Sequence, residues 1–205
     1  MPITINGSGT VTGISAGGLP DGCIVTADIV DNNITEAKIA NGAVTQAKRS
    51  EQLTLGTAKA STSGTAIDFT GIPSWVKRVT VMFNGVSTNG TSVVLVQLGN
   101  TSFVTSGYTS IASGFTVTSA NTLGFTTGFS TGDTSSADMV RFGTMVISNV
   151  SGNIWVAGGG LAVQGLGKHI FSGGITLPGT LDRVRITTVN GTDTFDAGSI
   201  NILYE

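Results

Sequence analysis

From residue 51 onward, apolar and polar side chains alternate in short runs, and most runs end at a turn signal. In residues 75–83, for example, Val79, Val81 and Phe83 occupy every second position. Such a period of two, with one polar side, predicts half-buried antiparallel strands. Short strands at fairly regular spacing predict an antiparallel β-sandwich with a jelly-roll-like arrangement. The expected strands are residues 53–61, 63–69, 75–83, 91–99, 140–150, 153–163, 182–189 and 198–204.

Asn-Gly pairs mark two of the expected turns. The pair Asn84-Gly85 is expected to end the strand over residues 75–83, and the pair Asn190-Gly191 is expected to be a hairpin turn. The span from residue 51 to residue 205 is long enough to bury about 65–70% of its unfolded surface around one core.

Residues 21–50 carry a different pattern, a repeat with a period of ten residues that reads DGCIVTADIV, DNNITEAKIA, NGAVTQAKRS. One β-branched residue and one alanine per block bury too little surface to offset a backbone ordering cost of roughly 1–2 kcal/mol per residue. Several chains wound together would bury a continuous seam, so the repeat predicts a trimeric stalk. A flexible linker is the alternative. The expected seam consists of Ile24, Ile34, Val44, Ala27, Ala37 and Ala47.

Residues 1–20 are rich in glycine and contain few sizeable apolar side chains. Such a stretch makes no core of its own, so we expect it to become ordered by docking on a partner or on sister chains. A frayed tail is the alternative. The side chains expected to dock are Ile3, Ile5, Val11 and Ile14.

Composition narrows the class further, because only 11% of the 205 residues are charged and the formal net charge is −2. The lack of a basic excess argues against a nucleic-acid partner. The sequence contains no apolar run of 18 residues, so no membrane span is predicted. The single cysteine, Cys23, excludes an internal disulfide framework. No charged residue lies between Arg78 and Asp133, or between Arg141 and Lys168. We expect this long uncharged surface to contact sister subunits first and a neutral ligand second.

Candidate catalytic residues are sparse. His169 is the only histidine, and with no nucleophile in a recognisable context we expect it in a surface or loop role. Asp133 and Asp138 form one pair of acids that glycoside hydrolysis could use. Asp193 and Asp196 form another, but both pairs lie in polar stretches where aspartate serves turns. We therefore expect no catalytic residue, no cofactor and no metal site.

Aromatic side chains in the uncharged stretches are the candidates for stacking on sugar rings. Trp75 and Trp155 fall inside apolar runs, so we expect them in the core. Tyr108, between Gly107 and Thr109, is expected to be exposed and to contact a glycan. The other aromatic residues in or near these stretches are Phe115, Phe125 and Phe129.

Several stretches, taken as whole motifs, carry a family resemblance. ITINGSGTVTGISAGGLP resembles the opening of tailed-bacteriophage tail-fibre and virion appendage proteins, and ITEAKIANGAVTQAK resembles their Val-Thr-x-Ala-Lys stalk repeats. IPSWVKRVTVMFNGVSTNG and LDRVRITTVNGTDTFDAGSINILYE resemble their C-terminal β-domain. The resemblance implies a homotrimer that is fixed to the virion by its N-terminus and carries a distal β-domain. It implies no catalytic residue.

These features together predict a mainly β, non-enzymatic fibre protein located in the virion. Residues 1–20 are expected to attach to other virion proteins, residues 21–50 to form the stalk, and residues 51–205 to form a head that adsorbs to a host-surface glycan. A head or baseplate decoration protein without a receptor is one alternative, and an enzyme that degrades surface polysaccharide is another. Nucleic acid and membrane insertion are not expected.

Overall fold

The structure is a computed structural model that describes residues 53–115, 120–165 and 167–205, together with residues 25, 27, 29, 33–35, 38–40, 43 and 44. The chain divides into two compact units, residues 1–49 and residues 50–205. The second unit is mainly β, and its described strands all pair antiparallel. The predicted β class and antiparallel pairing are therefore confirmed.

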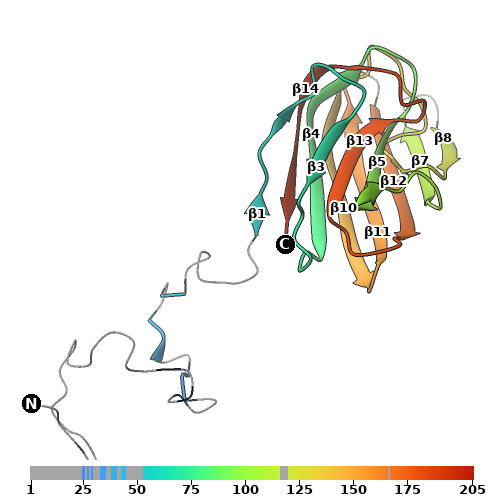
Figure 1. Ribbon diagram of the computed structural model, residues 1–205. Coiled ribbons are helices and arrows are strands. Elements are labelled where there is room, and N and C mark those ends of the chain that lie inside the picture. The colour runs from blue at the N-terminus through green and yellow to red at the C-terminus, as the bar shows by residue number, and fades with distance from the viewer. Residues whose placement is uncertain are drawn as a thin grey trace, which may run out of the picture. The chain divides into compact units, whose positions relative to one another are not determined.

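The described strands form two sheets, of nine and five strands (Figure 1). The larger sheet consists, in order, of β1 (Thr54–Leu55), β14 (Phe195–Tyr204), β4 (Arg78–Thr88), β10 (Arg141–Ser151), β11 (Ile154–Val163), β12 (Gly167–Thr176), β7 (Thr109–Phe115) and β8 (Ala120–Phe125), and β2 (Lys59–Ala60) also pairs with β14. The smaller sheet consists of β3 (Ile67–Thr70), β13 (Arg183–Thr188), β5 (Val94–Asn100) and β6 (Ser102–Phe103), and β9 (Phe129–Ser130) also pairs with β5.

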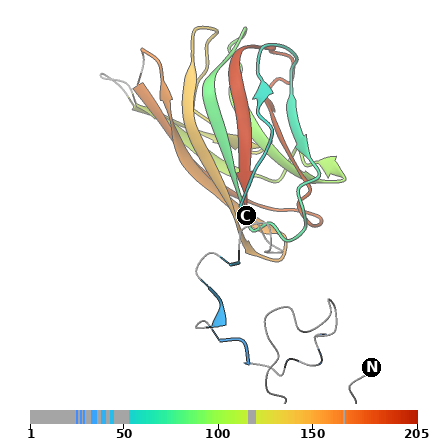
Figure 2. The same ribbon diagram turned by 90° about the vertical axis from the view of Figure 1, so that its left-hand side faces the viewer.

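The two sheets share one hydrophobic core, as expected for a β-sandwich. Val79 and Val81 of β4 contribute to it from the larger sheet, and Val184 and Ile186 of β13 from the smaller one, all fully buried. Figure 2 shows β10, β4 and β14 side by side in the larger sheet. Strands β10, β11 and β12 follow one another as a meander within that sheet. A jelly roll has eight strands in two sheets, whereas the two sheets described here have nine and five strands.

The prediction that a strand ends at Asn84-Gly85 is wrong. β4 continues through this pair, and its pairing with β10 shifts register at Gly85, so that this glycine is the extra residue of a β-bulge. Gly85 has a φ of +68°, which is the left-handed conformation that an Asn-Gly turn also requires. The dipeptide therefore gives the same sequence signal for a bulge and for a turn.

The pair Asn190-Gly191 is a turn, but it does not form a hairpin. The Gly191 N–H donates to the Thr188 carbonyl oxygen at 3.0 Å. The chain then passes from β13 in the smaller sheet to β14 in the larger sheet. The turn therefore connects the two layers of the sandwich.

The alternation of residue types does not predict β7, β8 or β12. In β7 the buried positions include Ser110 and Gly114, so the apolar half of the period-two pattern is missing. Glycines occupy several positions of β12 as well. These strands form through ladder pairing with their neighbours rather than through a strong local signal.

Candidate functional site

Over β7, β10, β11 and β12 the outer face of the larger sheet carries little charge in the described residues, whereas Arg78 and Glu205 form an exposed ion pair beside it. Outward positions alternate with buried ones along β7, β10, β11 and β12, and Lys168 is the charged residue among those outward positions. Three outward positions in the middle of this face have no side chain, because they are glycines: Gly158, Gly160 and Gly174. A set of large apolar side chains on the face is 40–50% exposed: Ile111, Phe142, Ile154, Val156 and Ile170. A broad uncharged face with several exposed apolar side chains is typical of a surface that another protein covers.

A pocket of about 290 Å³ lies at one end of this sheet. β7, β8 and β12 contribute to it, together with the segment that precedes β10. Its two charged residues, Asp133 and Lys168, have opposite signs, and Met139 and Val163 supply apolar wall. The lining side chains are Phe115, Asn121, Asp133, Thr134, Met139, Val163, Lys168 and His169.

A buried acid and base form the back of the pocket. Asp133 is 4% exposed and His169 is 5% exposed, and Nε2 of His169 lies 3.5 Å from Oδ1 of Asp133. This distance is longer than that of a strong hydrogen bond. Oδ1 of Asp133 and Nδ1 of His169 have no hydrogen-bond partner among the described residues.

Two glycines make room for these side chains. A Cβ on Gly114 would lie 2.1 Å from Oδ1 of Asp133, and a Cβ on Gly132 would lie 2.0 Å from Nδ1 of His169. Gly114 is also the cross-strand partner of His169 between β7 and β12. The imidazole and the carboxylate are therefore held by direct contact with backbone on two sides.

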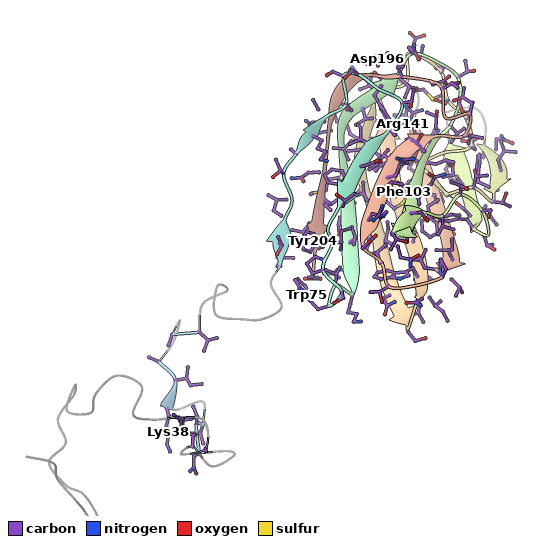
Figure 3. The ribbon with its side chains drawn as sticks, viewed as in Figure 1. Lys38, Trp75, Phe103, Arg141, Asp196 and Tyr204 are labelled. Carbon is purple, nitrogen blue, oxygen red and sulfur yellow. The ribbon has the colours of Figure 1, made fainter. Side chains whose placement is uncertain are left out.

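Arg141 is the first residue of β10 and is labelled in Figure 3, and its charge lies close enough to act on His169. It is 1% exposed, and its guanidinium donates to the Met139 carbonyl oxygen at 3.0 Å and to the Ser135 hydroxyl at 2.6 Å. Burial lowers the pKa of Arg141 to about 10. Burial is also the main cause that lowers the pKa of His169, and the nearby Arg141 charge adds to it, while Asp133 acts in the opposite direction.

The arrangement does not form a nucleophile–base relay in the described part of the chain. No hydroxyl group of a described residue bonds to His169, because Ser130 donates to the Gly132 carbonyl oxygen and Ser135 accepts from Arg141. The described residues also contain no group of three or more side chains suited to hold a metal ion. The pocket is therefore suited to binding a ligand by hydrogen bonds and ring contact.

The structure corrects two expectations about acidic and basic residues. His169 is not a surface or loop residue, since it lies inside β12 and is buried. Asp133 is buried as well, whereas its expected partner Asp138 is exposed. Asp193 does serve a turn, because its Oδ1 accepts a hydrogen bond from the Asn190 side-chain amide at 2.6 Å.

The expectation that Tyr108 is exposed is also wrong. Its side chain is 2% exposed and its ring lies edge-on against Phe129, with 5.0 Å between the ring centroids. Its hydroxyl accepts the Leu98 N–H at 2.7 Å and donates to the Val104 carbonyl oxygen at 3.1 Å. The hydroxyl thus completes the edge of β5, so that Tyr108 is not available as a platform for a sugar.

The two tryptophans lie where the sequence predicts. Trp155 is 3% exposed within the core, and Trp75 packs against the core as a partly buried side chain. Figure 3 shows Trp75 close to Tyr204, with 6.1 Å between the ring centroids. Neither tryptophan is presented as a flat, open surface for a ligand.

The repeat residues are described only in part. Ile34 and Val44 are 55% and 52% exposed, and Ala27 is exposed too, which agrees with the argument that one chain alone does not bury them. Their packing in a seam stays a prediction. Three expected seam residues lie outside the described residues: Ile24, Ala37 and Ala47. The expected docking residues Ile3, Ile5, Val11 and Ile14 also lie outside them.

Two short turns occur in the described repeat residues, and they begin five positions apart. The Lys38 N–H donates to the Thr35 carbonyl oxygen, and the Ala43 N–H donates to the Ala40 carbonyl oxygen, both at 2.9 Å. Ile39 is a further exposed apolar residue, and Ile29 stands ten positions before it. The first two blocks therefore share a second apolar position, which Arg49 occupies in the third block.

No protein-family model, no curated protein and no solved structure matches the chain at a significant level. The resemblance to phage fibre proteins thus rests on the sequence stretches alone. Among the described residues there is also no helical segment with the length and hydropathy of a membrane span.

Sequence reasoning did not identify the pocket. In the sequence Phe115 is one aromatic among several, Asp133 lies in a polar stretch and Lys168 ends an uncharged stretch. In β12 Lys168 and Ile170 are exposed while His169 and Phe171 are buried, but the residue types Lys-His-Ile-Phe do not alternate and give no such signal in the sequence.

Proposed function

We propose that this chain is a non-enzymatic virion fibre protein that works as a homotrimer. In this proposal residues 1–20 attach it to other virion proteins and residues 21–50 form the stalk. Residues 51–205 form a β-sandwich head that adsorbs to a glycan on the host surface. The sequence stretches that resemble phage fibre proteins support the order of these parts.

The observation that carries the proposal is the uncharged outer face of the larger sheet. Val156 and Ile170 stand near the middle of this face and are 43% and 46% exposed. Contiguous apolar patches that stay exposed on a soluble protein commonly mark a contact with another molecule. Packing of sister heads through this face would bury its apolar side chains, so we expect the face to lie at the contact between copies.

The opposite sheet offers a contrast. On β13, Arg185 makes a two-pronged ion pair with Asp68 of β3, with both N–O distances at 2.7 Å, and Arg183 pairs with Asp182 at 2.6 Å. These cations are already engaged within the chain. A charge-led contact with the host through them is therefore less favoured than contact with an uncharged glycan.

Light scattering behind a sizing column tests the assembly. We expect three times the chain mass of 20.7 kDa. Val156→Lys, which places a charge at the centre of the outer face, is expected to weaken association of the heads, because several buried unpaired charges would meet at one level. Thr70→Lys on the smaller sheet is the matched control. A stable monomer of the unaltered chain, or equal effects of the two variants, would contradict the proposal.

Binding of labelled protein to host cells tests the adsorption. Contact with a neutral glycan should change little between 0.01 M and 1 M salt, over which the Debye length falls from about 30 Å to about 3 Å. A steep loss of binding with salt would point to a charge-led contact instead. If no host cell binds the protein at any salt concentration, the decoration role replaces adsorption.

A further inference from the structure

We propose that the pocket between Phe115, Asp133 and Lys168 binds a single uncharged pyranose ring at the end of a glycan chain. This inference names the ligand of the proposed host contact, and it rests on that function for its biological role. The site itself is argued from the pocket alone.

The size of the pocket limits the ligand. Its volume is about 290 Å³, which is at the lower end of the range of roughly 300–1,000 Å³ for small-molecule sites. One sugar ring fits this space better than an oligosaccharide. The remainder of a glycan would have to extend into solvent.

The charges of the pocket favour a neutral ligand. Asp133 would repel an anion, while Lys168 at the wall and the buried Arg141 behind it would repel a cation. A ligand with both donors and acceptors satisfies both sides, because a carboxylate only accepts hydrogen bonds and an ammonium group only donates them. The amide of Asn121 and the hydroxyl of Thr134 can do either. Sugar hydroxyl groups have this dual character.

Asp133 is placed in advance for such a contact. It lines the pocket while it is 4% exposed. Its Oδ1 is itself buried against Gly114 and His169 and has no hydrogen-bond partner among the described residues, so contact with a ligand falls to the rest of the carboxylate. The close backbone of Gly114 and the imidazole of His169 restrict its position. A buried carboxylate short of donors gains much from a ligand that supplies one, and a fixed side chain loses little entropy on binding.

Phe115 supplies the apolar side of the site. Its ring is 37% exposed in the pocket wall, and Nζ of Lys168 lies 6.0 Å from the ring centroid. A pyranose has a face of C–H groups that packs on an aromatic ring, while its hydroxyl groups point outward to polar partners. The pocket lining contains both kinds of surface.

Titration calorimetry and ligand-observed NMR with the full chain test the inference. The probes are neutral hexoses and their N-acetyl derivatives, with glucosamine as a cationic and glucuronate as an anionic comparison. At least one neutral sugar should bind with a millimolar Kd, as expected for a ligand of about a dozen heavy atoms. The charged comparisons should bind more weakly. Absence of binding by every neutral sugar, or tighter binding by a charged one, would overturn the inference.

Variants locate the binding. Phe115→Ala should weaken the best neutral sugar about threefold to tenfold, and Asp133→Asn should weaken it about ten- to hundredfold. Phe142→Ala is the matched control, since Phe142 is 40% exposed on the same sheet but does not line the pocket. Phe115 is a surface residue, so its variant keeps the test decisive if Asp133→Asn folds poorly. Equal weakening by Phe115→Ala and Phe142→Ala would place the sugar elsewhere and refute the site.

The two proposals fail in different ways. If free sugar binds in the pocket but the protein does not adsorb to host cells, the adsorption function is wrong and the ligand class stands. If the protein adsorbs to cells while no neutral sugar binds, the inference about the pocket is wrong and the function stands.

Discussion

Replacing Tyr108 by Phe isolates one hydroxyl group that completes the edge of a strand. β6 pairs with β5 at Gly99 and Asn100, and β9 pairs with it at Leu95 and Val96. Between these two short ladders the Leu98 N–H donates to the Tyr108 hydroxyl at 2.7 Å. The hydroxyl thus takes the place of a ladder partner.

The expected cost follows from burial. Leu98 is fully buried, so Tyr108→Phe keeps the aromatic ring in place but leaves a buried N–H without this partner. Such an unsatisfied donor costs about 1–3 kcal/mol. In a domain of this size each kcal/mol lowers the melting temperature by roughly 2–4 °C, so a decrease of about 2–12 °C is expected. Urea unfolding followed by circular dichroism should show a lower midpoint with an unchanged m-value.

Tyr204→Phe is the matched control for this experiment. Tyr204 is partly buried beside Trp75, and its hydroxyl makes no hydrogen bond to another described residue. Its removal should change the free energy of unfolding by less than about 0.5 kcal/mol. The reasoning is refuted if Tyr108→Phe is as stable as the unaltered chain. A Tyr108→Phe protein that keeps its stability but no longer adsorbs to cells would restore Tyr108 as a ligand platform.

Three further predictions concern the pocket and the smaller sheet. Gly114→Ala should destabilise the protein by about 1–3 kcal/mol through overpacking against Asp133, whereas Gly124→Ala on β8, whose added Cβ would meet no atom closer than 3.8 Å, should leave the urea midpoint nearly unchanged or raise it. Burial lowers the folded-state pKa of His169 below its ordinary value of 6.5, so the unfolded chain binds more protons below about pH 6.5. Thermal melts from pH 7.5 to pH 5 should therefore show stability falling as the pH falls. A stability that rises as the pH falls over this range would contradict the burial of a neutral His169. A double-mutant cycle of Asp68→Ala and Arg185→Ala should give a coupling of about 0.5–1 kcal/mol in the free energy of unfolding, and this coupling should shrink in 1 M salt, as expected for a partly exposed ion pair. A coupling insensitive to salt would mean that the pair is more shielded from water than the structure shows.

The strands that the sequence predicts well are those with a complete period of two. In β4 the residues Val79, Val81 and Phe83 face the core, and in β13 Val184 and Ile186 do the same. The local pattern is sufficient there because one face is apolar at every second position. Boundaries are less certain from sequence, since Asn84-Gly85 carries the backbone preference of a turn and is used for a bulge.

The sequence shows two long stretches without charge, but it does not show which side chains make up the uncharged face. Whether Ile111, Val156 and Ile170 lie on one face depends on which strands pair and in which register. Ile111 pairs with Ser172, and Gly174 pairs with Val156. A one-residue slip in any of these ladders would turn a whole set of side chains to the other side of the sheet. The local sequence does not contain this information.

The pocket brings together residues that have no common signal in the sequence. Asp133 and His169 belong to segments that are far apart in the sequence, and each has an ordinary local interpretation as a turn acid or a loop histidine. They meet because β12 pairs with β7 so that His169 stands opposite Gly114, where the missing side chain leaves space for the Asp133 carboxylate. Gly132 then allows the imidazole to approach the backbone closely. The functional signal is therefore the combination of a polar side chain with a glycine across the ladder. Neither partner carries that signal alone, and only the register of the strands brings the two together.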